Sequence, residues 1–108
     1  MGKHIIWLGT EVKSPPLSRE ARLKTGYLLR MLQGGEPLSL PDSRPMPRIG
    51  LRCHELRIND TELTWRVIYR IDKDAILILD VFPKKTVQTP KAVIESCRLR
   101  AKAFDADF

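Results

Sequence analysis

The sequence predicts an α+β fold in which a mainly antiparallel four-stranded sheet packs against helices. Three strand-like segments follow one another closely between residues 52 and 82. Apolar residues recur at helical spacing on both sides of that region. A short apolar run at residues 5–8 adds a first strand. At 108 residues the chain is expected to form one domain, residues 1–108.

The first helix is predicted over residues 17–33, where the apolar residues share one side. Ser14 and the two prolines after it would begin this helix, because proline is tolerated in the first turn. Residues 36–50 contain four prolines, which lack a backbone donor and disfavour helices and central strands. We therefore expect a long connector without regular structure, with Arg44 and Arg48 at its far end.

Three strands are predicted next, over residues 52–59, 63–72 and 75–82. Because the links between them are short, neighbouring strands must run antiparallel. The third strand is an almost continuous apolar run, which is typical of a strand covered on both faces. Thr89 and Pro90 then begin a second helix, whose apolar stripe ends near residue 104.

Alternation along these strands gathers cations on one face of the sheet, because successive side chains point to opposite sides. Trp65, Val67 and Tyr69 share an apolar face that is expected to meet a helix. The other face is expected to be polar and exposed, and a polyanion would supply the missing negative charge. Ion pairing of the one carboxylate would account for a single cation. This face would hold Glu55, Arg57, Arg66 and Arg70, with Lys84 and Lys85 at one end.

Charge and cysteine content narrow the classes of protein. The net charge is +6, and residues 44–102 alone carry this excess. Such a charge favours nucleic acid, anionic lipid or an acidic protein as partner. A surface that is charged only for solubility explains it equally well. Cys53 and Cys97 lack metal-site or redox spacing, as expected for reduced thiols in the cytoplasm. No run reaches the roughly 20 apolar residues of a membrane helix. No signal peptide, structural zinc site or cofactor is expected.

Three short sequence motifs resemble those of a known protein family: His-Glu-Leu-Arg at residues 54–57, Trp-Arg-Val-Ile-Tyr-Arg at 65–70 and Phe-Pro-Lys-Lys-Thr at 82–86. In this order and spacing they resemble the RelE/ParE toxin superfamily, and most of all its HigB-like, phage-related branch. The resemblance implies a RelE-like fold and the toxin of a type II toxin–antitoxin pair. Such toxins cleave mRNA on the ribosome, next to small-subunit rRNA, and a HigA-like helix-turn-helix antitoxin holds them inactive.

The resemblance also implies roles for individual residues. Arg66 corresponds to the arginine that contacts the scissile phosphate. Arg57 corresponds to the arginine that ends the family's Leu-Arg motif. Lys84 and Lys85 correspond to the basic residues after the last strand. Where relatives carry lysines ahead of that motif, this chain has Glu55 and Cys53.

Metal-independent RNA cleavage by the 2′-hydroxyl needs a base, cations that stabilise the phosphorane, and an acid for the leaving oxygen. Arg66 and Lys85 would stabilise charge, since arginine suits bidentate phosphate contacts. Glu55 is the better candidate for proton transfer, because alternation turns His54 towards the core or an edge. The predicted catalytic set is Arg66, Lys85, Glu55 and Arg57. The predicted RNA-binding set is Lys84, Arg70, Arg44, Arg48 and His54.

One departure from the family concerns the general base. Several relatives place a Tyr or His near the C-terminus, where this chain has Phe104, and the tyrosines Tyr27 and Tyr69 lie in core-like patterns.

Two other functions therefore stay open: a ParE-like gyrase poison that is not a nuclease, and a non-toxic basic nucleic-acid-binding module. If Arg66 is exposed, Arg66→Ala should abolish activity with little loss of stability.

Overall fold

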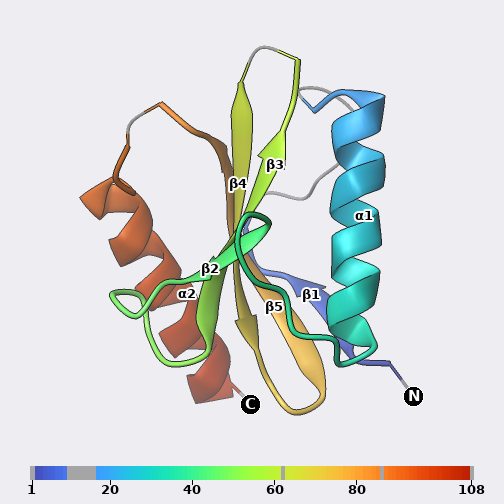
Figure 1. Ribbon diagram of the computed structural model, residues 1–108. Helices are drawn as coiled ribbons and strands as arrows, with labels where there is room; N and C mark the ends of the chain where they lie inside the picture. Colours follow the sequence, from blue (N-terminus) through green and yellow to red (C-terminus); the bar gives the residue numbers. More distant parts are fainter. Residues whose placement is uncertain (1, 10–16, 62, 86, 108) are drawn as a thin grey trace.

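Five strands form one mixed sheet between two helices in the computed structural model, which describes residues 2–9, 17–61, 63–85 and 87–107 (Figure 1). The α+β prediction is thus confirmed, with one strand more than expected. The strand order is β1-β5-β4-β3-β2, and only β1 runs parallel to its neighbour. The elements are β1 (His4–Trp7), α1 (Arg19–Gln33), β2 (Ser43–Pro45), β3 (Cys53–Asn59), β4 (Thr64–Ile71), β5 (Ala75–Pro83) and α2 (Lys91–Asp107).

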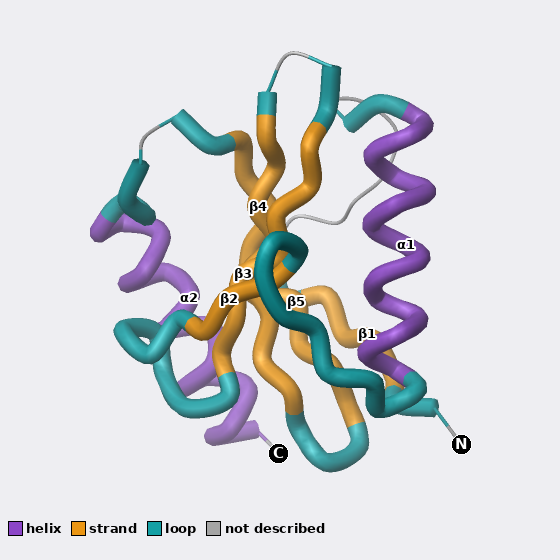
Figure 2. The backbone as a smooth tube through the Cα atoms, viewed as in Figure 1, coloured by secondary structure: helices purple, strands orange, loops and turns teal. Residues whose placement is uncertain are grey.

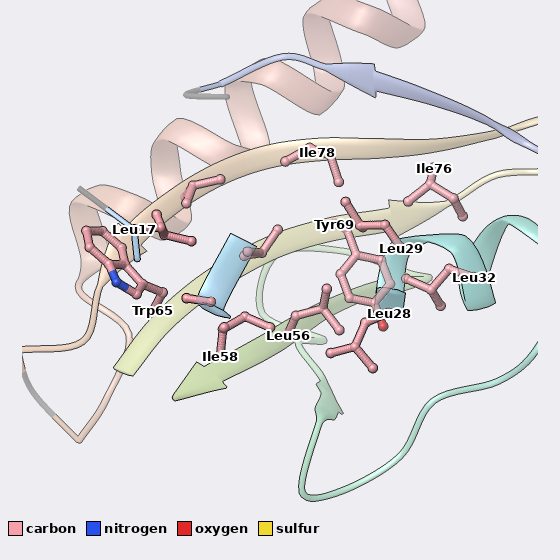
Figure 3. Close-up of a cluster of buried hydrophobic side chains, with 13 residues drawn as sticks. Leu17, Leu28, Leu29, Leu32, Leu56, Ile58, Trp65, Tyr69, Ile76 and Ile78 are labelled. Atoms are coloured by element: carbon pink, nitrogen blue, oxygen red, sulfur yellow. The ribbon is translucent and has the colours of Figure 1, made fainter. Parts of the chain in front are cut away.

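The two helices lie on opposite faces of the sheet, as Figures 1 and 2 show, so the sheet is the middle layer. The face towards α1 carries the apolar set predicted from alternation: Trp65, Val67 and Tyr69 are buried with leucines of the helix (Figure 3). The central β5 contributes to both cores, with Ile78 on the α1 side and Leu77 on the α2 side. Its continuous apolar sequence is explained by this double burial.

The additional strand is β2, which lies in the proline-rich segment and forms the edge of the sheet beside β3. The prediction of an irregular connector was wrong for these three residues. An edge strand needs donors on one side only, so Pro45 can end it. The following amide, of Met46, donates to the carbonyl of Cys53 at 2.8 Å. Because of this pairing, Arg44 lies directly beside Glu55.

The first helix begins at Arg19, with the Ser18 hydroxyl accepting a hydrogen bond from the amide of Ala21 at 3.1 Å. The start predicted at Ser14 lies outside the described residues. One residue of the predicted stripe is misplaced: Tyr27 is 57% exposed and is not a core residue. Leu28 and Leu32 are buried as expected.

The second helix follows Pro90 as predicted, since the amides of Val93 and Ile94 both donate to the Pro90 carbonyl. Ile94 and Cys97 are its buried residues. Cys97 and Cys53 are both free thiols, as expected. Neither helix among the described residues has the length and apolar character that crossing a membrane would require.

Candidate functional site

The predicted polar face exists, but it is not exposed. Glu55 and Arg66 lie on the α2 side of the sheet, where their exposed fractions are 0% and 1%. The expectation of an exposed Arg66 was therefore wrong. Arg66 is buried because the residues just before α2 cross this face of the sheet. Strand alternation predicts the face on which a side chain lies, but not whether another segment covers it. The guanidinium of Arg66 donates to the carbonyl of Val87 at 3.0 Å and to the hydroxyl of Thr89 at 3.3 Å.

Glu55 is the centre of this buried group. Its Oε1 accepts from Nε of Arg44 at 3.1 Å. Its Oε2 lies 3.5 Å from Nη1 of Arg66 and accepts from the hydroxyl of Thr89 at 3.4 Å. Both carboxylate oxygens are thus engaged. In the strand register Arg57 lies directly opposite Arg66, on the same face. We call Arg44, Glu55, Arg57 and Arg66 the arginine cluster.

The arginine cluster contains more positive than negative charge, with three guanidinium groups around one carboxylate. Burial lowers the pKa of Arg66, and the positive charges of Arg44 and Arg57 lower it further. The negative charge of Glu55 acts in the other direction and raises it. An anion placed here would relieve that repulsion, and arginine forks match phosphate oxygens in geometry. The chemistry of the arginine cluster is therefore that of a candidate phosphate site.

Two hollows in the surface adjoin the arginine cluster. The first has a volume of about 240 Å³ and brings Arg66 together with Lys85, the pair predicted to stabilise charge. The second, of about 330 Å³, contains Arg44 and Arg48 along one side and Thr89 along the other. We call these the Lys85 hollow and the Arg48 groove.

Three other predicted residues lie elsewhere. Lys84 directly follows β5, next to Lys85. His54 is on the opposite face, stacked on the ring of Tyr69 with centroids 5.3 Å apart, and burial lowers its pKa. It is thus the core or edge histidine that alternation indicated. Arg70 shares the α2 face, but about 13 Å along the strand from Arg66.

Two carboxylates hold Arg70 in place. Asp105 contacts it at 2.7 Å and Asp72 at 2.8 Å. These bonds raise the pKa of Arg70 and tie the end of α2 to the sheet. The structure therefore does not bring Arg70 into the arginine cluster.

The contribution of the segment before α2 to this site was not predicted from the sequence. The hydroxyl of Thr89 bridges Glu55 and Arg66, and the carbonyl of Val87 binds the same arginine. Thr89 was interpreted only as the start of a helix. The one signal available was a polar residue directly before a predicted helix, which is also the ordinary sign of a cap.

In the part of the chain that the structure describes, no group of three or more His, Cys, Asp or Glu residues could hold a metal ion. A search of curated proteins gave no match to the chain. The sequence profile of the phage-derived Gp49-like proteins (DUF891) matches residues 16–102, which include every residue of the arginine cluster. The chain therefore belongs to the Gp49-like family of phage-derived proteins, a family associated with RelE-like toxins.

Proposed function

We propose that this protein is the toxin of a type II toxin–antitoxin pair and a ribosome-dependent, metal-independent endoribonuclease that cleaves mRNA and so inhibits translation. The observation that supports it best is the arginine cluster, in which Arg44 and Arg66 pair with one buried carboxylate and Arg57 lies opposite Arg66. Its excess charge suits a phosphate, and Arg66 is among the residues that line the Lys85 hollow. The Gp49-like family and the HigB-like sequence motifs support the same function.

In the proposed reaction the 2′-oxygen of a ribose attacks the adjacent phosphorus. A bond from that oxygen to phosphorus forms, and the bond to the 5′-oxygen of the next nucleotide breaks. The 2′-hydroxyl loses its proton, and the leaving 5′-oxygen gains one. The phosphorane between these steps carries additional negative charge on its oxygens. Arg66 and Lys85 line one hollow and would stabilise that charge. Removing one such donor typically costs about 10²–10³-fold in rate.

Glu55 suits positioning better than proton transfer. A general base needs a lone pair within reach of the substrate hydroxyl. Both oxygens of Glu55 are engaged, and its side chain is fully buried. We propose that Glu55 orients Arg44 and Arg66 for the phosphate. Arg57 would then add charge from the neighbouring strand.

The proposed partners follow from this function. The mRNA would be cleaved on the ribosome, beside small-subunit rRNA, and a HigA-like helix-turn-helix antitoxin would neutralise the toxin. Co-expression with a helix-turn-helix protein encoded by a small reading frame beside this one should then restore growth. If the neighbouring product binds the protein without restoring growth, this assignment of the antitoxin is wrong.

The test is induced expression in a bacterial host, with growth recorded and the 5′ ends of cellular RNAs mapped. Lys85→Ala is the informative variant, because Lys85 is exposed and its loss should not unfold the protein. Lys73→Ala, on an exposed turn away from the arginine cluster, is the matched control. Growth arrest with new 5′ ends inside translated codons, lost in Lys85→Ala and kept in Lys73→Ala, supports the proposal. Wild-type protein that leaves mRNA intact refutes it.

One observation favours a second function, a ParE-like gyrase poison that cleaves no RNA. Among the described residues that line the Lys85 hollow and the Arg48 groove, none is a His, Asp, Glu, Cys or Tyr that could accept a proton. The nearest candidate, Glu55, is fully engaged. Growth arrest with intact mRNA and induced DNA damage would support this function.

A further inference from the structure

A second group of cations lies on the α2 side of the molecule, beyond the arginine cluster. Arg98 and Lys102 are exposed and stand one turn apart on α2, at positions that share a helix face. The turn between β2 and β3 lies beside this helix (Figures 1 and 2). It contributes Arg48 and Arg52, both exposed. We call Arg48, Arg52, Arg98 and Lys102 the basic strip.

One hydrogen bond joins the two parts of the basic strip, and a shared hollow adjoins three of its residues. Nε of Arg98 donates to the carbonyl of Arg48 at 2.8 Å, which fixes the turn against the helix. A hollow of about 360 Å³ has Arg52, Arg98 and Lys102 in its lining. Arg52 has a φ of 63°, an uncommon conformation for a residue other than glycine.

The carboxylates nearby do not cancel this charge. Asp105 itself lines the hollow together with Arg70, and Asp72 adjoins it. Both carboxylates bind Arg70 through short hydrogen bonds. Asp72 also approaches Arg52, at the longer distance of 3.6 Å. Arg98 and Lys102 therefore face a site with an excess of positive charge.

The basic strip continues the candidate functional site. Arg48 lines the Arg48 groove together with Arg44, and its carbonyl binds Arg98. From Thr89 to Lys102, the chain advances by ~20 Å at the helical rise of about 1.5 Å per residue. In OB folds, sites for single-stranded nucleic acid extend over about 4–16 nucleotides along a positively charged groove. Lys102 therefore lies roughly 20 Å along the chain from Thr89, the residue that binds Arg66.

We propose that the basic strip binds the backbone of the RNA strand that enters the arginine cluster, several nucleotides to one side of the scissile phosphate. This inference rests on the proposed function for its choice of RNA. It assigns Arg52, Arg98 and Lys102 to substrate binding and gives them no part in the chemical step. A short RNA would occupy the arginine cluster alone, whereas a longer one would reach the basic strip.

The test measures binding of fluorescein-labelled 2′-O-methyl RNAs of 4 and 16 nucleotides by anisotropy over a range of salt concentrations. These RNAs cannot be cleaved, so the result does not depend on catalysis. The strip variant is Arg98→Ala with Lys102→Ala. The matched control is Arg19→Ala with Arg30→Ala, which removes the same charge from exposed positions of α1, across the sheet. Thermal unfolding of both variants verifies that each is folded.

The strip variant should weaken binding of the 16-nucleotide RNA at least tenfold at low salt and change affinity for the 4-nucleotide RNA less than twofold. Two lost phosphate contacts should reduce the slope of log Kd against log salt by about 1.4, at about 0.7 per contact for single strands. The control should bind both RNAs like wild type. Equal losses in both variants would show a net-charge effect and overturn the proposal, as would a loss independent of length. Equally effective competition by polyglutamate of matched charge would indicate an acidic protein partner and also overturn it.

If nuclease activity is absent in cells but the length-dependent loss is found, the proposed function fails and the RNA-binding strip stands. If cleavage is found but the strip variant binds long RNA like wild type, only the strip is refuted. The two proposals can thus fail separately.

Discussion

Truncation of Arg66 should destabilise the protein, because the remaining carboxylate of Glu55 would stay buried. In Arg66→Met the aliphatic stem is kept and the guanidinium is lost. Glu55, fully buried, would then keep only Arg44 and Thr89 as partners. Breaking one side of a buried ion pair costs about 3–5 kcal/mol. Arg44 remains at 3.1 Å from Glu55, so we expect a loss of about 3 kcal/mol, at the lower end.

The measurement is urea and thermal unfolding followed by circular dichroism. For a domain of this size, 1 kcal/mol shifts Tm by about 4–8 °C, so a loss of about 3 kcal/mol should lower Tm by at least 12 °C. The matched variant is Arg66→Met combined with Glu55→Leu, which removes both buried charges. Replacement of a buried pair by apolar residues is often neutral or stabilising. The double variant should therefore be more stable than Arg66→Met alone.

A loss below about 1 kcal/mol in Arg66→Met, the range of an exposed ion pair, would refute the buried pair described above. A double variant less stable than the single one would refute the reasoning about the unpaired carboxylate. The same reasoning decides how activity is tested. Loss of toxicity in Arg66→Ala would mix loss of fold with loss of chemistry, whereas Lys85→Ala separates them.

Four other expectations can be checked directly. Trp65→Ala should cost about 3–5 kcal/mol in urea unfolding, because Trp65 is buried against α1; wild-type stability would contradict the core assignment. Hydrogen bonds from Ser18, Thr61 and Trp65 lower the pKa of Asp60 to about 2, so its stabilisation is complete above about pH 4 and is lost as pH falls towards 2; Asp60→Asn should lower Tm at pH 7 and weaken its acid dependence. Burial raises the pKa of Cys97 to about 12, so thiol reagents should label it only on unfolding. Arg57→Gln should raise Tm slightly and weaken RNA binding, because Arg57 lies opposite Arg66; a fall in Tm would show that Arg57 stabilises the sheet.

The side of the sheet on which each residue lies could be predicted from the sequence. Period-two alternation placed Trp65 and Tyr69 towards α1, and Glu55 and Arg66 on the other face. The predicted sharing of this face by Arg57 and Arg66 is confirmed, and the strand register places them directly opposite each other. These relations are local, because they depend on neighbouring strands joined by short turns.

Exposure could not be predicted in the same way, because it depends on segments distant in the chain. Arg66 is covered by residues 87–89, more than twenty positions away. Arg70 is bound by Asp105, which follows it by 35 residues. Arg44 pairs with Glu55 only because β2 forms, in a segment whose prolines argued against any strand. In each case a tertiary contact decided the environment of a charge.

The arginine cluster stabilises the fold less well than apolar residues at the same positions would. The neighbouring α2-side position in β4, Ile68, is apolar and fully buried, so this face accommodates ordinary core residues. At Arg57 and Arg66, however, two like charges face each other across the strands, which is unfavourable. One carboxylate cannot neutralise three guanidinium groups. Stable proteins break such local rules chiefly at functional sites, where a ligand supplies what is missing. A ligand that fits here would carry negative charge and a pair of oxygen acceptors, as the two non-bridging oxygens of a nucleic-acid phosphate do, and an RNA strand would continue from it onto the basic strip.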